Sequence, residues 1–170
     1  MQFRKAEPAD VPVLMSIYEE GRKSIRTFGI DQWQNGYPAE ADVREDIALS
    51  RLWLICGDDG MICGVFAFID DGEPTYDVIH NGVWLTGDTH NYAAVHRVAV
   101  SMAARGTGSA GCMMDKAAEM AAEIGMTSVR IDTHEGNLAM RGMLEKNGFT
   151  CCGVIYLANG DPRVAYEKKI

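Results

Sequence analysis

The pattern of apolar and polar residues along this chain shows two periods, one typical of helices and one typical of strands. Apolar residues recur at helical spacing from Val11 onward, over 39–49, over 108–124 and over 137–146. Short apolar runs bounded by turn residues predict strands at 2–4, 52–56, 62–69, 93–100, 127–132, 149–157 and 164–167. The pattern therefore predicts a mixed fold in which a hairpin region precedes two strand–helix units.

Cap and turn residues mark where these elements begin and end. Asp10 stands where it can cap the first helix and Asn137 where it can cap the last, which should stop at Gly148. Residues 29–38 and 70–91 break both periods and are expected to be loops; a loop as long as the second is usually functional or mobile. The third helix should bury an apolar stripe made of Met113, Ala117, Met120 and Ile124.

Length and composition narrow the class of protein. The chain has 170 residues, which fits one domain over 1–170, and it is 47% hydrophobic and 24% charged, as soluble globular proteins are. No apolar run is long enough to cross a bilayer, and the first residues lead into no signal core, so a cytoplasmic location is expected. The formal charge, 16 minus 24 or −8, disfavours nucleic acids and anionic membranes as partners and weakly favours a cationic amine.

Cysteine and histidine residues give no sign of a disulfide framework or a metal site. The number of cysteines is odd and none forms a CxxC pair, which favours reduced thiols that pack as small hydrophobic side chains. The cysteines are Cys56, Cys63, Cys112, Cys151 and Cys152. The adjacent Cys151 and Cys152 should face opposite sides of a strand. The four histidines lack the spacing of metal ligands, so no metal is expected.

The segment from Val98 to Ala110 carries the clearest chemical signal. A strand runs into a glycine-rich turn, and that turn opens an amphipathic helix. The first turn of a helix has unpaired N–H groups and a positive dipole end, and glycine lets such a backbone approach a diphosphate closely. Arg105 adds a positive charge nearby. Taken alone, the segment fits either a phosphate-binding loop or a plain tight turn.

Two familiar nucleotide-binding loops fit this segment less well. A Rossmann loop would follow the first strand of alternating β and α units, whereas this turn lies beyond the midpoint of the chain. A Walker-type loop needs Lys followed by Ser or Thr after its last glycine, and Gly111-Cys112 does not supply them.

With these features the chain resembles the GNAT superfamily of acetyltransferases. Arg105, Gly108 and Ala110 match the pyrophosphate loop of that family. Asn137 and Gly148-Phe149 match its second element, an Asn that opens a helix ending in Gly-Phe. The resemblance covers nearly the whole chain. It implies an α+β fold, with a mixed and mostly antiparallel sheet that carries helices on both faces.

The resemblance also implies that acetyl-CoA is the acyl donor. In such a fold the strands that hold Val98 and Ile131 run parallel and splay apart, and pantetheine inserts between them like an added strand. The diphosphate would lie on the N–H groups of the glycine-rich turn. The residues implied as contacts are Val98, Ala99, Val100, Arg105, Gly106, Thr107, Gly108, Ser109, Ala110, Asn137, Met140 and Leu144.

Proton transfer is the second requirement of this chemistry, because an ammonium cannot attack a thioester. The family often places a Tyr on the last helix to protonate the leaving thiolate, but Leu144 occupies that position here. Backbone N–H near Val98 would hold the oxyanion. His96 is the first candidate for accepting the proton of the amine and His134 the second, since an imidazole titrates near neutral pH. For His96 the alternative is a buried histidine satisfied by backbone, and Asp132 reads either as a residue that orients a histidine or as a structural one.

The acceptor side is less defined by the sequence. The family builds its acceptor wall from the loop between the first helices, which places Trp33, Gln34 and Tyr37 there; their alternative role is to cover the edge of the core. Trp84 could belong to a lid. Arg97 could bind an acceptor carboxylate or pair with an acidic residue.

These features together predict an N-acetyltransferase for a small amine or an amino acid. Two other functions stay open at this point: a protein N-terminal or lysine acetyltransferase, and a non-catalytic module that binds acyl-CoA. Members of the family often form dimers, so a homodimer is a further expectation, although no stripe in the sequence indicates one.

Overall fold

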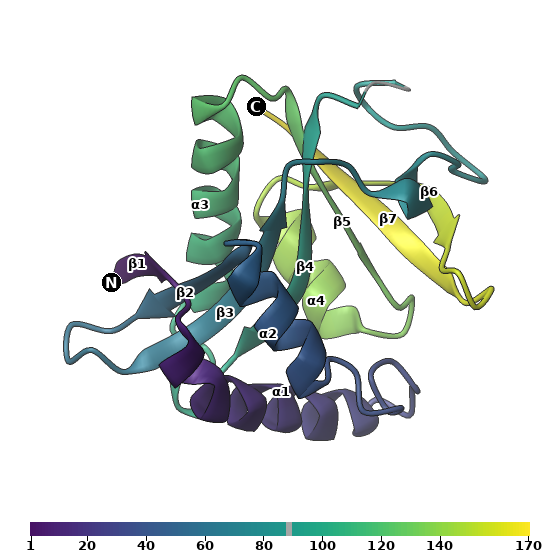
Figure 1. Ribbon diagram of the computed structural model, residues 1–170. Helices are drawn as coiled ribbons and strands as arrows, with labels where there is room; N and C mark the ends of the chain where they lie inside the picture. Colours follow the sequence, from purple (N-terminus) through teal and green to yellow (C-terminus); the bar gives the residue numbers. More distant parts are fainter. Residues whose placement is uncertain (88–89) are drawn as a thin grey trace. The chain divides into compact units, whose positions relative to one another are not determined.

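The computed structural model describes residues 1–87 and 90–170, which form two compact units (Figure 1). Unit 1 comprises Met1–Phe68 and Arg97–Met113, and unit 2 comprises Ile69–His96 and Met114–Ile170. Neighbouring strands follow the order β1-β2-β3 in unit 1 and β4-β5-β7-β6 in unit 2, and β4 (Tyr92–Val100) contributes one half to each unit. None of the helices in the described part of the chain combines the length and apolar character needed to cross a membrane.

Unit 1 is an antiparallel arrangement with two helices. Its elements are β1 (Gln2–Lys5), η1 (Pro8–Asp10), α1 (Val11–Arg26), α2 (Glu40–Ala48), β2 (Leu52–Cys56), β3 (Ile62–Ile69), the second half of β4, η3 (Met102–Ala104) and the start of α3 (Ser109–Glu123). β1 pairs antiparallel with β2, and β2 pairs antiparallel with β3. The hairpin between β2 and β3 has the boundaries that the apolar runs predict.

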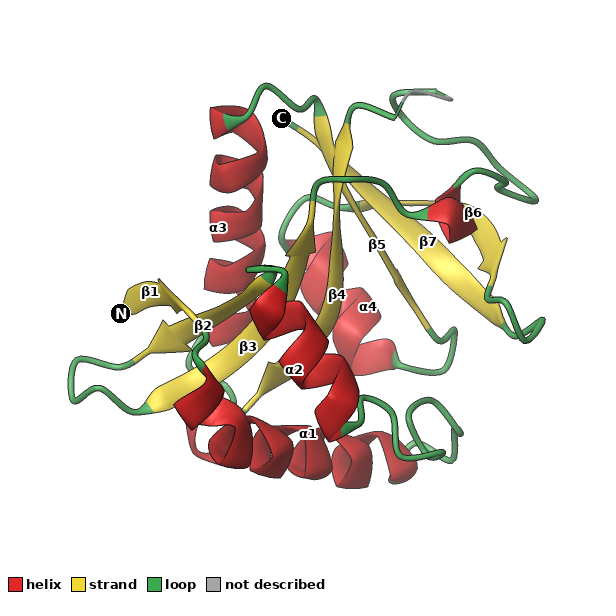
Figure 2. Cartoon of the chain, viewed as in Figure 1, coloured by secondary structure: helices red, strands yellow, loops and turns green. Residues whose placement is uncertain are grey.

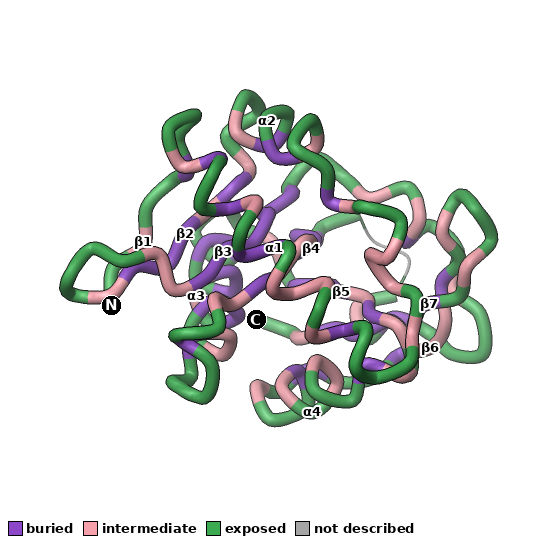
Figure 3. Tube along the Cα trace, turned by 90° about the horizontal axis from the view of Figure 1, so that it is seen from below, coloured by how far each residue is buried: buried purple, intermediate pink, exposed green. Residues whose placement is uncertain are grey.

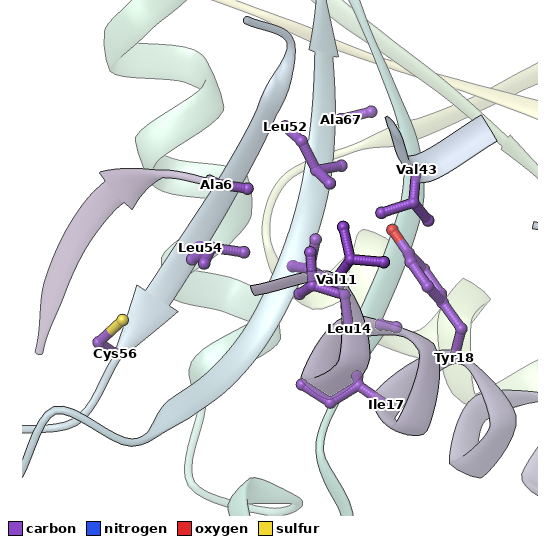
Figure 4. Packing of buried hydrophobic residues seen from close by; sticks show 12 residues of the cluster. Ala6, Val11, Leu14, Ile17, Tyr18, Val43, Leu52, Leu54, Cys56 and Ala67 are labelled. Atoms are coloured by element: carbon purple, nitrogen blue, oxygen red, sulfur yellow. The ribbon is translucent and has the colours of Figure 1, made fainter. Parts of the chain in front are cut away.

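Helices pack on both faces of the strands in unit 1. Figure 4 shows Leu14 and Tyr18 from α1 converging with Leu52 from β2 in the main core cluster of this unit. On the opposite face, the Cα of Gly64 lies so close to α3 that an added Cβ would meet the Cε of Met113 at 3.1 Å. Successive residues of a strand point to opposite faces, so β3 contacts α1 with one set of residues and α3 with the other.

Unit 2 contains the parallel pair of strands. Its elements are η2 (Pro74–Tyr76), the first half of β4, the rest of α3, β5 (Ser128–Thr133), α4 (Leu138–Lys146), β6 (Thr150–Tyr156) and β7 (Pro162–Lys169). β4 runs parallel to β5 from Tyr92–Ser128 to Ala94–Arg130, whereas β7 is antiparallel to both β5 and β6. Within the described residues, the pairing of β4 with β5 ends there although both strands continue.

The sequence between β3 and β4 is a packed part of unit 2. Tyr76 and Trp84 from this sequence are buried with Tyr92, Ala94 and other residues of the sheet in a second core cluster. The aromatic side chains therefore anchor the loop expected at 70–91, in which residues 88–89 lie outside the described ranges.

Most predicted elements are observed within one or two residues of their expected ends (Figure 2). Asn137 caps α4 through a bond from the Met140 N–H, as predicted. Asp10 occupies the N-cap of α1, but its carboxylate binds Arg4 and the N–H of Glu7 instead of capping this helix. Ile124 is exposed because α3 ends at Glu123 and does not carry the stripe further.

Burial along the chain corrects one expectation about the cysteines. Figure 3 shows β2 and β3 largely buried, with exposed turns between the elements. Cys56 and Cys152 are buried, Cys63 is half-buried, and Cys112 and Cys151 are exposed; all five thiols are free. Cys151 and Cys152 differ in burial, although the register of β6 against β7 shifts between Cys151 and Gly153, so the opposite orientation expected from strand alternation stays a prediction.

Candidate active site

The predicted cofactor loop, Arg105–Ala110, lies in unit 1 between β4 and α3. Gly106 and Gly108 have φ angles of +77° and +86°, in the left-handed region that favours glycine. No atom lies within 4 Å of the position that a Cβ would take at either residue. The loop therefore keeps a bare backbone directly before the helix.

The N–H groups of this loop are available to a ligand. Among the described residues, none accepts a hydrogen bond from the backbone N–H of Gly106, Gly108, Ser109 or Ala110. The Thr107 hydroxyl is 2.6 Å from the carbonyl oxygen of Ala104 and holds the turn closed. Free N–H groups at the positive end of a 15-residue helix fit the diphosphate of acetyl-CoA.

The strand leading to the loop carries a local distortion. Arg97 has a φ of +54°, which breaks the regular alternation of side chains along β4. Its carbonyl oxygen accepts a hydrogen bond from the Tyr18 hydroxyl at 3.2 Å. In a regular strand His96 and Val98, two residues apart, would point to the same side, but this does not hold across Arg97. Val98, Ala99 and Val100 follow it in unit 1.

Asn137, Met140 and Leu144 belong to unit 2, so their place on the opposite wall of a cofactor site stays a prediction. Met140 is half-buried and Leu144 is fully buried. Tyr166, on β7, is held by Arg141 and Glu145 of α4 through bonds of 3.0 Å to its hydroxyl.

A cluster of titratable side chains surrounds His96 in unit 2. His96 shares a strand face with Tyr92 and Ala94, because side chains of β4 alternate up to this point. Its Nε2 lies 2.8 Å from Oε2 of Glu73, and its Nδ1 lies 3.9 Å from Oδ1 of Asp132 on β5. The Tyr76 hydroxyl donates to the same Asp132 oxygen at 2.7 Å. The structure thus brings His96 and Asp132 together and adds Glu73 and Tyr76.

Glu73 is ionised throughout the neutral range. Burial opposes its charge, but His96 and Thr75 outweigh burial and lower the pKa of Glu73 to about 2. Burial and the neighbouring Asp132 raise the pKa of Tyr76 well above its usual value, so this phenol stays protonated. The cluster therefore places an imidazole beside an ionised carboxylate and a protonated phenol.

The lowered pKa of Glu73 predicts a pH-dependent term in stability. A depressed carboxyl pKa contributes stability above about pH 4.5, its value without partners, and that contribution is lost as the pH falls toward about 2. We expect Glu73→Gln to reduce the urea midpoint at pH 6 but to leave a smaller difference from wild type below pH 4. An equal difference at both pH values would contradict this assignment.

His134, the second candidate base, has a structural contact. Its Nδ1 accepts a hydrogen bond from the N–H of Gly136 at 3.0 Å, in the turn that leads into α4. In the neutral ring this places the proton on Nε2. His134 therefore helps to form the turn before Asn137.

Arg97 and Tyr37 form a buried network with Asp46 in unit 1. The Arg97 guanidinium contacts Asp46 at 2.6 and 2.8 Å and donates to the Tyr37 hydroxyl at 2.6 Å. Burial raises the pKa of Asp46 even though Arg97 opposes this effect. Arg97 is thus committed to an internal carboxylate, which is the second of the two roles that the sequence left open for it.

Trp33 and Gln34 hold their loop against α1. The Trp33 ring packs edge-on against Tyr18, with ring centroids 5.9 Å apart. The Gln34 amide donates to the Arg22 carbonyl at 3.0 Å and accepts from Arg26 at 2.8 Å. These contacts are those of residues that cover the edge of a core, and an additional acceptor contact stays a prediction.

Trp84 lies in the core of unit 2, which differs from the lid that its loop position suggested. It is 4% exposed, and the centroid of its ring lies 4.2 Å from the guanidinium carbon of Arg130, which is also 4.0 Å from the ring centroid of Tyr92. Arg130 in turn pairs with the buried Glu167 at 3.0 Å. The ring is therefore engaged by the protein itself.

Sequence reasoning missed Glu73, Tyr76 and the Arg130–Glu167 pair. Glu73 and Tyr76 stand in a polar loop with no motif around them, and their role depends on contacts with strands far along the chain. Buried charges within strands were the only available signal for Arg130 and Glu167. In the described ranges, no group of three or more His, Cys, Asp or Glu is arranged to hold a metal ion.

Comparison with known proteins identifies the same family that the sequence motifs resemble. A model of the family described as "Acetyltransferase (GNAT) family" matches residues 18–149. The crystal structure of a GNAT-family acetyltransferase from Streptococcus agalactiae is 37% identical in sequence, with a TM-score of 0.90, and the match covers 99% of this chain and 95% of that one. A search of curated proteins gave no match.

Two more distant structures share the fold. One is a paia N-acetyltransferase from Thermoplasma acidophilum in complex with coenzyme A, at 15% identity and a TM-score of 0.73, covering 99% of this chain and 98% of that one. The other is a ribosomal-protein-alanine N-acetyltransferase from Brucella melitensis, at 17% identity and a TM-score of 0.70, covering both chains fully at 100%.

Proposed function

Since this chain belongs to the GNAT family of acetyltransferases, we propose that it moves the acetyl group of acetyl-CoA to an amine on a small molecule or an amino acid. The family fixes the class of enzyme as an acyltransferase. An amine as the acceptor is supported by one observation, the His96 cluster, where an imidazole stands beside an ionised carboxylate. A cationic amine must lose a proton before it attacks, and this cluster can take it.

In this proposal one group of residues binds acetyl-CoA and another transfers a proton. Acetyl-CoA, when bound, supplies an activated acyl group on a thiol that can leave as a thiolate. The N–H groups of Gly106–Ala110 bind its diphosphate, and Arg105 adds charge beside them. His96 accepts a proton from the acceptor ammonium and returns it to solvent after transfer. No side chain at position 144 donates to the thiolate, because this residue is Leu144.

Two other functions are distinguished by experiment. A protein N-terminal or lysine acetyltransferase would acetylate peptides in preference to free amines. A non-catalytic module would bind acetyl-CoA without releasing thiol. We expect a panel of free amines, amino acids and peptides, followed by detection of the CoA thiol, to give turnover with free amines; turnover with peptides alone would overturn the choice of acceptor. The cytoplasmic location and the homodimer expected from the sequence stay predictions.

The cofactor loop gives a prediction for Gly108→Val. A branched side chain at a φ of +86° would strain the backbone and occupy the space beside the free N–H groups, so we expect acetyl-CoA affinity to fall at least about 10-fold. In wild type, acetyl-CoA at about 100 times its Kd should add roughly 2.7 kcal/mol and raise Tm by roughly 5 to 10 °C. Calorimetry and thermal shift measure both effects.

Gly160→Val is the matched control for this variant. Gly160 has a φ of +88°, also has no atom within 4 Å of its Cβ position, and lies in the turn between β6 and β7. It should lose a similar amount of stability while it retains acetyl-CoA affinity. Equal affinity in the two variants would show that the loop at Gly108 is only a turn.

A further inference from the structure

Glu73 is held in one orientation by its own segment. Its Oε1 accepts hydrogen bonds from the N–H of Thr75 at 3.1 Å and from the Thr75 hydroxyl at 2.7 Å. Its backbone carbonyl accepts from the Tyr92 hydroxyl at 3.3 Å. Since one carboxylate oxygen and the backbone are fixed, the position of the second oxygen, Oε2, is fixed as well.

This second oxygen faces one nitrogen of His96. Oε2 lies 2.8 Å from Nε2, and both side chains are largely shielded from water, with 17% and 20% of their surfaces exposed. Nε2 is buried and makes no aligned hydrogen bond among the described residues, so the carboxylate acts on it electrostatically, favouring an N–H at this nitrogen over a lone pair. A carboxylate at this distance favours a proton on Nε2 and stabilises the imidazolium once it forms.

The other nitrogen of His96 faces a different carboxylate. Nδ1 and the Asp132 oxygen are 3.9 Å apart, too far for a direct hydrogen bond. That oxygen already accepts from the Tyr76 hydroxyl, which fixes Asp132 in place. The groups that face the imidazole from neighbouring elements are thus Glu73, Tyr76 and Asp132.

We propose that Glu73 is a positioning residue for His96: it keeps the proton of the neutral ring on Nε2, so that Nδ1, on the side of Asp132, accepts the proton of the acceptor. The inference rests on the proposed function for the role of His96 as base. Two protons leave the acceptor nitrogen in the reaction. The ammonium gives the first to Nδ1, and the imidazolium, paired with Glu73, later releases it to solvent. The neutral amine forms the C–N bond as the C–S bond of the thioester breaks, and the second proton passes from the nitrogen, through solvent, to the leaving CoA thiolate. Glu73 itself stays ionised and does not exchange a proton.

The test uses Glu73→Gln in the full chain. The Gln oxygen can keep the bonds from Thr75 while its NH₂ group turns toward Nε2, which reverses the preferred ring tautomer. We expect kcat/KM for the best amine of the panel to fall about 10-fold or more, with acetyl-CoA affinity unchanged. The acidic limb of the pH profile should move to lower pH, because the imidazolium has lost its carboxylate. Nitrogen-15 NMR of the His96 ring should show the proton on Nε2 in wild type and a shift toward Nδ1 in the variant.

Two further variants separate positioning from a general loss of structure. Thr75→Val keeps Glu73 but removes the hydroxyl that fixes Oε1, and it should give a smaller loss in the same direction. Glu123→Gln makes the same change of charge at an exposed position near the end of α3 and should change neither rate nor tautomer. If Glu73→Gln does not fold, Thr75→Val decides by the same readouts.

The outcomes also separate this inference from the proposed function. A folded Glu73→Gln variant with unchanged kcat/KM and pH profile would overturn the inference, as would a loss of rate with the wild-type tautomer. If wild type acetylates no amine, the proposed function fails, while the NMR comparison still decides whether Glu73 sets the tautomer of His96.

Discussion

Replacement of His96 by Gln is expected to lower kcat/KM by about 100-fold or more and to remove the acidic limb of its pH profile. The physical reason is the surroundings of the ring. His96 stands between the ionised Glu73 and Asp132, so an imidazolium formed by proton transfer has a counter-charge 2.8 Å away. Gln retains most of the volume of the side chain but cannot take up a proton.

The measurement is kcat/KM as a function of pH for both proteins, with the acetyl-CoA affinity of each determined separately. His90→Gln is a suitable control, since the His90 side chain is 77% exposed and its Nδ1 lies 3.8 Å from Asp77. That variant should behave as wild type. A folded His96→Gln protein that keeps both its rate and its acidic limb would transfer the role of base to Asp132, His134 or water.

A second large effect is expected from Glu167→Gln, which should lower the free energy of unfolding by about 3–5 kcal/mol. Glu167 is fully buried, and its Oε1 accepts from Arg130 at 3.0 Å and from the hydroxyls of Ser128 and Thr86 at 2.6 Å each. Burial opposes its charge, but these donors prevail and lower the pKa of Glu167. Its amide replacement leaves the Arg130 charge buried without a counter-charge.

Urea denaturation at neutral pH measures this loss. Glu119→Gln removes an exposed carboxylate that pairs with Lys116 at 3.2 Å on α3, and it should change stability by no more than about 0.5 kcal/mol. If Glu167→Gln lowers the free energy of unfolding by less than about 1 kcal/mol, another group must neutralise the charge of Arg130 in the variant. Replacing Arg130 and Glu167 together should be less damaging than the single change, because no charge is then left alone.

The sequence predicted best what depends on neighbouring residues. The hairpin of β2 and β3, the cap at Asn137 and the glycine-rich turn at 106–108 are each set by local backbone preferences and by short-range periodicity. The motifs of the family are also short stretches of neighbouring residues. For this reason the sequence alone was enough to predict the position of the cofactor loop and each of its residues.

What the sequence did not reveal depends on contacts over long separations. Glu73 meets His96 only because the segment before β4 folds back over its own strand, and nothing in the residues around Glu73 signals this. The residues around Arg97 predict a regular strand, and its φ of +54°, which interrupts the alternation of side chains, could not be predicted from them. The position of Trp84 in a long loop suggests a possible role in a lid, yet its ring packs in the core against Arg130, a buried cation from a strand far along the chain.

The hydrogen bonds of Glu167 and Arg130 also determine how the loop before β4 opens. Glu167 accepts hydrogen bonds from the backbone N–H groups of Leu85 and Thr86, while Arg130 donates to the carbonyl of Gly87 at 2.8 Å. These amides lie in a loop, but releasing them to solvent requires breaking contacts of a carboxylate on the last strand. Amide hydrogens of Leu85 and Thr86 should therefore exchange with water on the slow timescale of β7, since loop and strand open as one cooperative element.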